Sequence, residues 1–125
     1  MYRYLIITLM LMSGYVSAHE FTPTYPKLTQ SFVEGLYSTK MVLLNKRKDV
    51  EYYEIKVFDE DWERVPFAVA SGNLINIKYL ERKRIEVYIK EKDINRARYI
   101  CSKSKLIVEG GSKTSLSSRI CSKIK

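Results

Sequence analysis

The sequence predicts an all-β protein, an antiparallel β-sandwich of about seven strands. Apolar and polar residues alternate over many short stretches, which is the pattern of a strand with one buried and one solvated face. Turn-forming residues separate these stretches at regular intervals, and no stretch shows a helical period. Because a sheet with one apolar face needs a second layer to cover it, we expect two packed sheets.

The first eighteen residues are predicted to be a secretory signal rather than part of the fold. Arg3 is followed by a run over residues 5–12 that is apolar except for Thr8, and small residues occupy positions 16–18. The run is short for a membrane span, although an N-terminal anchor that is retained is the alternative. Cleavage after Ala18 leaves residues 19–125 as one domain. We therefore expect a periplasmic or secreted protein.

Residues 50–70 predict a β-hairpin around an acidic turn at residues 59–61. The apolar positions in phase are Tyr53, Ile55 and Val57 before the turn and Val65, Phe67 and Val69 after it. Pro66 lacks a backbone donor, so the second strand is expected at a sheet edge.

Further strands are predicted along the rest of the chain. They cover residues 37–45, 75–79, 85–90, 97–106 and 115–125, after an extended lead-in (residues 19–35) that lies partly along a sheet edge. The number and shortness of the strands favour a sandwich of immunoglobulin-like size. The competing fold is an oligonucleotide-binding barrel, which has fewer and longer strands.

Cys101 and Cys121 are the only cysteines, and an even count in an exported protein indicates one disulfide. If the last two strands pair, the two residues come within bonding reach. The closed loop of roughly 20 residues is worth about 3 kcal/mol. Two unbonded thiols are the alternative.

Catalytic and metal sites are not expected. His19 is the only histidine and lies at the predicted mature terminus, so a serine or cysteine nucleophile has no folded base. The acidic turn lacks the glycine and closing glutamate of a calcium loop, and no helix follows Gly110 and Gly111 to bind phosphate. We expect no cofactor, no metal and no enzyme activity.

The formal net charge of +8 favours acidic partners, although lysines scattered over solvated strand faces explain it more simply. Tyrosines among basic residues also suggest a platform for nucleic acid. By parity, however, Tyr53, Tyr79 and Tyr99 are predicted to lie in or near the core, whereas Tyr52 and Tyr88 point outward.

Three stretches resemble the N-terminal immunoglobulin-like domain of the periplasmic chaperones of chaperone–usher pilus assembly. Residues 38–43 are similar to the family's first strand, in which a threonine and a basic residue precede a β run. Residues 57–61 and 65–69 are similar to its second strand, polar turn and third strand. Residues 122–125 look like the basic end of its seventh strand.

The resemblance implies a mode of partner binding. In that family, two basic residues anchor the carboxylate of a pilin subunit, and the seventh strand donates alternating hydrophobic side chains to the subunit's sheet. Carried over by position, Lys40 and Lys125 are the anchors, and the donated side chains are Leu116, Ser118 and Ile120. Lys40 stands in place of the family's arginine, and Ser118 is polar where the family has a hydrophobic residue.

The leading functional hypothesis is a small exported chaperone-like domain that captures another exported protein, pilin-like or a surface subunit, by edge-strand pairing. A second hypothesis is a secreted basic accessory protein that binds nucleic acid or anionic envelope polymers. A third is a structural subunit of a surface assembly.

Overall fold

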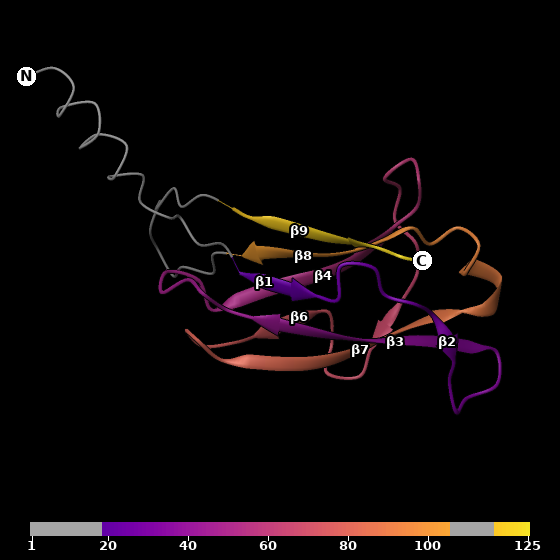
Figure 1. Ribbon diagram of the computed structural model, residues 1–125, viewed down its shortest axis with the longest axis horizontal. Coiled ribbons are helices and arrows are strands. Elements are labelled where there is room, and N and C mark those ends of the chain that lie inside the picture. Colours follow the sequence, from indigo (N-terminus) through magenta and orange to yellow (C-terminus); the bar gives the residue numbers. More distant parts are fainter. Residues whose placement is uncertain (1–18, 106–116) are drawn as a thin grey trace, which may run out of the picture.

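The computed structural model describes residues 19–105 and 117–125, and these residues form two packed antiparallel sheets (Figure 1). The first sheet has the order β1-β3-β7-β5, with β2 also paired to β3, and the second has the order β6-β4-β8-β9. The strands of the first sheet are β1 (Glu20–Thr22), β2 (Thr29–Gln30), β3 (Leu36–Leu44), β5 (Ala68–Val69) and β7 (Arg82–Lys90). Those of the second are β4 (Tyr52–Phe58), β6 (Leu74–Asn76), β8 (Tyr99–Lys105) and β9 (Arg119–Lys123).

The predicted all-β sandwich is confirmed, with nine strands in the described residues instead of about seven. The only helical element among them is a short 3-10 turn, η1 (Glu91–Asp93). The additional strands come mainly from the lead-in, where β1 and β2 both pair with β3. No helix in residues 19–105 or 117–125 is long and apolar enough to cross a membrane.

The core lies between the two sheets and is filled by the alternating residues of the long strands. Its completely buried side chains include Met41 and Leu43 of β3, Tyr53 and Ile55 of β4, Val87 and Ile89 of β7, and Ile100 of β8. Their neighbours in sequence point to the outer faces, as the period of two requires. Of the tyrosines assigned to the core, Tyr53 is buried, but Tyr79 is 44% exposed and Tyr99 is only half-buried.

The hairpin predicted for residues 50–70 is wrong. The strand β4 pairs with β6 and β8 in one sheet, whereas β5 crosses over and pairs with β7 in the other. A single bridge, between Phe58 and Arg64, joins the two sides of the acidic turn. Pro66 has no backbone donor and lies outside every strand, so the pairing cannot continue past it.

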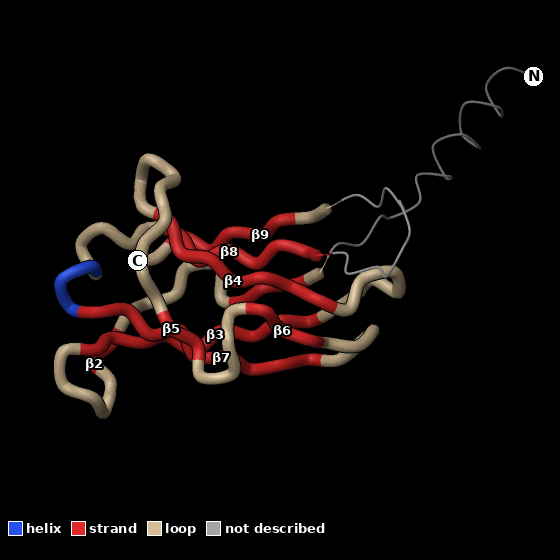
Figure 2. Tube along the Cα trace, turned by 180° about the vertical axis from the view of Figure 1, so that it is seen from behind, coloured by secondary structure: helices blue, strands red, loops and turns tan. Residues whose placement is uncertain are grey.

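The sandwich has two ends, which Figure 2 shows from behind. The leader end comprises the start of β1 at His19 and the loops 45–51 and 77–81. The opposite end comprises the β2–β3 hairpin, η1, the loop 59–67 and Lys125, and we call it the C-terminal end. At the leader end, fully buried Asn45 joins the two loops: its Nδ2 donates to the carbonyls of Val50 (2.6 Å) and Ile77 (3.0 Å).

Candidate functional site

The last strand, β9, is the outermost strand of its sheet. Among the strands of residues 19–105 and 117–125, it pairs only with β8, in a register that places Cys101 opposite Cys121 and Lys103 opposite Arg119. Ser104 N donates to Ser118 O (2.9 Å), and Ile124 N donates to Arg98 O (2.7 Å). In an antiparallel pair such bonds recur at every second residue. The even-numbered residues of β9 therefore bond to β8, and the odd-numbered ones direct their backbone groups outward.

Part of this outward edge is already occupied. The amide of Lys123 donates to Thr24 O (3.0 Å), and that of Lys125 donates to Pro26 O (2.9 Å). The outward backbone groups of Arg119 and Cys121 have no backbone partner among the described residues. An unpaired stretch of strand edge such as this one, beside which β1 of the other sheet lies, can pair with another chain. We call it the β9 edge.

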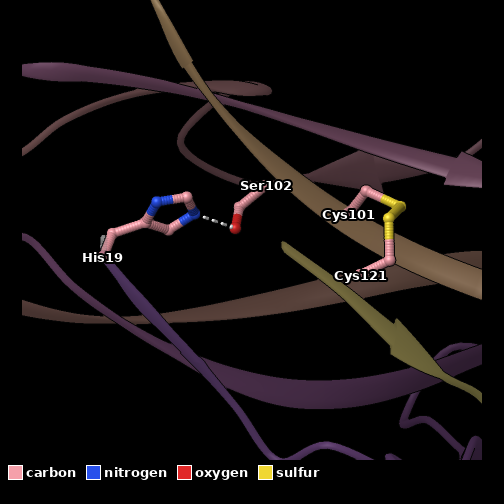
Figure 3. The surroundings of a disulfide bond; sticks show 4 residues. All are labelled: His19, Cys101, Ser102 and Cys121. Carbon is pink, nitrogen blue, oxygen red and sulfur yellow. Dashed lines mark hydrogen bonds between the residues drawn. A yellow bond between two sulfur atoms is a disulfide. The ribbon is translucent and has the colours of Figure 1, made fainter. Parts of the chain in front are cut away.

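A disulfide between Cys101 and Cys121 fixes β9 to β8, as the sequence predicts (Figure 3). The bond links residues that face each other across the ladder, with Cα atoms 4.0 Å apart. A one-residue slip of β9 would separate the two cysteines and turn every side chain to the other face. The disulfide therefore sets which backbone groups the β9 edge presents.

The side chains predicted for donation to a partner lie on the inner side of β9. Ser118 is half-buried and lies 3.1 Å from His19 Nδ1 through its Oγ. Ile120 is half-buried and packs against the core. Leu116 lies outside the described residues. The joint role predicted for these side chains stays a prediction.

The two predicted anchors lie on different sheets. Lys40 is in the middle of β3, exposed and opposite Glu86 of β7, and it lines a hollow of about 440 Å³ together with Lys27. Lys125 lines a different hollow, of about 420 Å³, at the C-terminal end. The structure does not bring Lys40 and Lys125 into one hollow, and their joint role stays a prediction.

The hollow at the C-terminal end is basic, and no acidic residue lines it. Its lining residues are Leu28, Tyr37, Ile94, Asn95, Ala97, Arg98, Lys123, Ile124 and Lys125. The guanidinium of Arg98 is held there by the carbonyls of Asn95 (2.8 Å) and Ala97 (3.2 Å). Three cations from adjacent chain segments suit a carboxylate, which accepts charge-assisted hydrogen bonds.

Lys27 is a basic residue that the sequence analysis did not single out. It follows Pro26, whose carbonyl accepts the amide of Lys125, and it precedes Leu28, which lines the same hollow as Lys125. The sequence pattern does not indicate this residue, because the strand that contains Lys40 is the first one it predicts. The structure has β1 and β2 before it, and Lys27 lies between these two.

An aromatic cluster lies on the outer face of the sheet beside the β9 edge. Trp62 stacks on Tyr99 with ring centroids 4.3 Å apart and planes inclined by 6°. The guanidinium of Arg119, from β9, lies 5.2 Å from the Trp62 ring and 5.9 Å from the Phe58 ring. Trp62 is 46% exposed and has a φ of 63° in the acidic turn, where Asp59 Oδ1 accepts the amides of Asp61 and Glu63 (both 2.9 Å).

His19 is part of the folded core, contrary to the expectation that the only histidine lies outside it. The side chain is 2% exposed, its Nε2 lies 2.8 Å from Ser102 Oγ, and its ring lies 4.5 Å from that of Tyr53. Burial lowers the pKa of His19 from 6.5 to about 4. Its Nδ1 faces the hydroxyl of Ser118 rather than a carboxylate. The pair with Ser102 thus differs from a catalytic serine–histidine pair, in which a carboxylate orients an accessible base.

Comparison with known proteins shows the fold. The solved structure of the E. coli chaperone DraB superposes with a TM-score of 0.65 at 18% sequence identity, covering 86% of this chain and 53% of that chain. The chain thus spans about half the length of DraB. No family model matches the sequence, and no curated protein matches it. The likeness confirms the predicted immunoglobulin-like sandwich fold.

Proposed function

We propose that this is an exported, chaperone-like binding domain that captures a segment of another exported protein at the β9 edge. The observation that carries the proposal is the pair of outward backbone positions at Arg119 and Cys121, which have no backbone partner in the described residues. An extended segment that pairs with them satisfies hydrogen-bonding groups on both chains. The fold similarity to the chaperone DraB is in keeping with this function.

The disulfide supports the proposal because an edge that binds a partner must keep one register. The bond between Cys101 and Cys121 crosses the ladder within the β9 edge itself. It is also the chemistry of an oxidising compartment, which fits a periplasmic or secreted location. Because the disulfide already fixes the β9 edge, the edge loses little conformational freedom when a partner strand binds. This preorganisation raises the affinity for the partner.

The basic hollow gives the captured segment an end point. A partner strand on the β9 edge that runs toward Lys123 ends where the segment 24–26 occupies the edge, beside the hollow lined by Arg98 and Lys125. We propose that these groups bind the partner's terminal or side-chain carboxylate, with Lys27 contributing from the segment that pairs with Lys125. Lys40, predicted as an anchor from the resemblance, lines the neighbouring hollow with Lys27 and is tested separately.

The backbone role is tested by comparing Arg119→Pro with Arg119→Ala. Proline removes the outward amide, which bonds to nothing in the described residues, whereas alanine keeps that amide and removes only the side chain. The probe is a fluorescent peptide with alternating apolar and polar residues and a free carboxylate, followed by anisotropy. Arg119→Pro is expected to abolish binding and Arg119→Ala to weaken it slightly. Equal binding by the two variants contradicts capture by backbone pairing.

The carboxylate role is tested with the same peptide and its amidated twin. The wild-type protein is expected to prefer the free carboxylate by roughly tenfold, and Lys125→Gln to remove most of that preference. Lys27→Gln and Lys40→Gln decide which second lysine takes part. If all three variants keep the preference, the basic hollow is not the anchor.

A further inference from the structure

The leader end carries two large apolar side chains that are turned to solvent. Tyr79 is 44% exposed and Leu80 is 61% exposed, although Ile75 and Ile77 just before them are buried. Leu80 has a φ of 63°, which a leucine rarely adopts and which costs about 1 kcal/mol or more. A strained backbone that exposes a leucine points to a function of that side chain.

The loop that holds these side chains is firmly built. Leu80 N donates to Asn45 O (2.7 Å), Asn45 N donates to Glu81 O (3.1 Å), and Glu81 N donates to Lys78 O (3.0 Å). Asn45 is itself completely buried and hydrogen-bonded through its side chain. The exposure of Leu80 is therefore fixed by the fold.

Basic residues surround the exposed pair. Residues 45–51 and 77–84 contain Lys46, Arg47, Lys48, Lys78, Arg82, Lys83 and Arg84 against the acidic Asp49, Glu51 and Glu81. The ammonium of Lys48 lies 5.3 Å from the centre of the Tyr79 ring. Asp49 is paired with Arg47, and Glu81 lies 3.6 Å from Lys83. Lys48, Lys78 and Arg84 form no ion pair with any residue that the structure describes, so this surface has excess positive charge.

The apolar and basic surface around Tyr79 and Leu80 lies at the end of the domain where the described chain begins. The described chain begins at His19 on the leader end (Figure 1), and the apolar stretch 5–12 comes before His19 in the sequence. If the predicted signal or anchor enters a bilayer, the end of the domain to which it is joined, the leader end, is the one next to the membrane.

We propose that the leader end binds the surface of an anionic phospholipid membrane. Tyr79 and Leu80 enter the interface between headgroups and acyl chains, and the basic residues around them contact the headgroup phosphates. An exposed leucine gains nothing from a nucleic acid, whose contacts are phosphates and stacked bases. This inference does not depend on the proposed partner capture, because it rests on the side chains of the loops 45–51 and 77–81, whereas the capture rests on the backbone groups of the β9 edge and on the basic hollow.

The test measures binding of the protein, as recovered after export, to vesicles of phosphatidylcholine with and without phosphatidylglycerol. Binding is expected only with phosphatidylglycerol and is expected to weaken with salt. The double variant Tyr79→Ser, Leu80→Ser is expected to bind roughly tenfold more weakly. The matched control is Phe32→Ser, Val33→Ser, which removes two adjacent exposed apolar side chains at the C-terminal end and is expected to bind like the wild type.

Insertion is followed with an environment-sensitive fluorophore on Leu80→Cys and, as the control, on Phe32→Cys. Only the label at position 80 is expected to shift to the blue on the anionic vesicles. The proposal is overturned if the two double variants bind equally, if neither label shifts, or if duplex DNA is bound as tightly as the vesicles with the same loss in the Tyr79→Ser, Leu80→Ser variant.

Discussion

His19 Nε2 lies 2.8 Å from Ser102 Oγ in the interior of the sandwich and thereby joins the start of β1 to β8 in the other sheet. On its other side, Nδ1 faces Ser118, whose Oγ lies 3.5 Å from that of Ser104. The imidazole thus bridges the two layers next to β9 (Figure 3). Burial favours the neutral ring in this bridge, because no carboxylate faces either nitrogen to compensate a charge.

Stability is expected to fall as the pH drops from about 6.5 to about 4. The folded protein holds the pKa of His19 near 4, whereas the unfolded chain has the ordinary value of 6.5, so the unfolded state binds the proton first. The stabilisation is complete above pH 6.5 and is lost on the way down to pH 4, at a cost of about 2 kcal/mol after allowance for solvent screening. Urea unfolding at a series of pH values measures this loss.

The control for the pH effect is His19→Phe, which keeps an aromatic ring beside Tyr53 and removes the titrating group. Its stability is expected to be nearly flat between pH 6.5 and pH 4.5. Glu20, Asp49 and Glu54 also have lowered pKa values, caused first by hydrogen bonds to Lys46, Arg47 and Lys56 respectively, and they act at lower pH. A wild-type slope that persists in the variant assigns the effect to groups other than His19.

Removal of the disulfide by the double change Cys101→Ala, Cys121→Ala is expected to lower the free energy of unfolding by about 3 kcal/mol. The bridged residues are 20 apart in sequence, and chain entropy gives this value for a loop of that length. Chemical denaturation at equilibrium measures it. The matched control on the same strand is Ser122→Ala, because Ser122 Oγ is buried and has no hydrogen-bond partner among the described residues, so its loss is expected to cost nothing. A comparable loss in both variants assigns the effect to packing of β9.

The alternation of residues was sufficient to predict the long strands and the class of fold. The positions predicted as buried in β4 and β7, such as Tyr53 and Ile89, are buried in the structure. Alternation does not specify which strand pairs with which, and the chain after the acidic turn therefore crosses to the other sheet instead of forming a hairpin. The disulfide was predictable because the two cysteines are the only ones and lie on neighbouring strands.

The candidate site was less accessible to sequence reasoning. The strands β1 and β2 have three and two residues, too short for a periodic signal, so the segment that occupies part of the β9 edge was not recognised. Tyr79 is an odd-numbered residue like the buried Ile75 and Ile77. The strand β6 ends at Asn76, however, and beyond a strand's end the alternation no longer predicts which side chains are buried. The residue at which a strand ends depends on the neighbouring strands with which it pairs, and the local sequence pattern does not predict these.

Asn45 is expected to be the most sensitive polar position of the fold. Besides its two donated bonds, its Oδ1 accepts the amide of Arg47 (2.9 Å) and the hydroxyl of Tyr53 (2.7 Å), and the side chains of Asn45 and Tyr53 have zero exposure. Asn45→Ala leaves several buried groups without partners and is expected to cost about 3 kcal/mol or more. Tyr53→Phe removes one of these bonds and is expected to cost about 1 kcal/mol. Thermal and urea denaturation measure both, and equal effects contradict the central role of the amide.

Trp62 is the only tryptophan in the chain, and its fluorescence is expected to report on the β9 edge alone. The ring lies between the loop 59–67 and Arg119 of β9, so a peptide that pairs beside Arg119 changes the surroundings of the indole. Anionic vesicles contact the leader end, far along the sandwich, and are expected to leave the emission unchanged. Arg119→Ala is expected to shift the emission of the unbound protein and to reduce the response to the peptide. A response of Trp62 to vesicles but not to the peptide contradicts the assignment of the two surfaces.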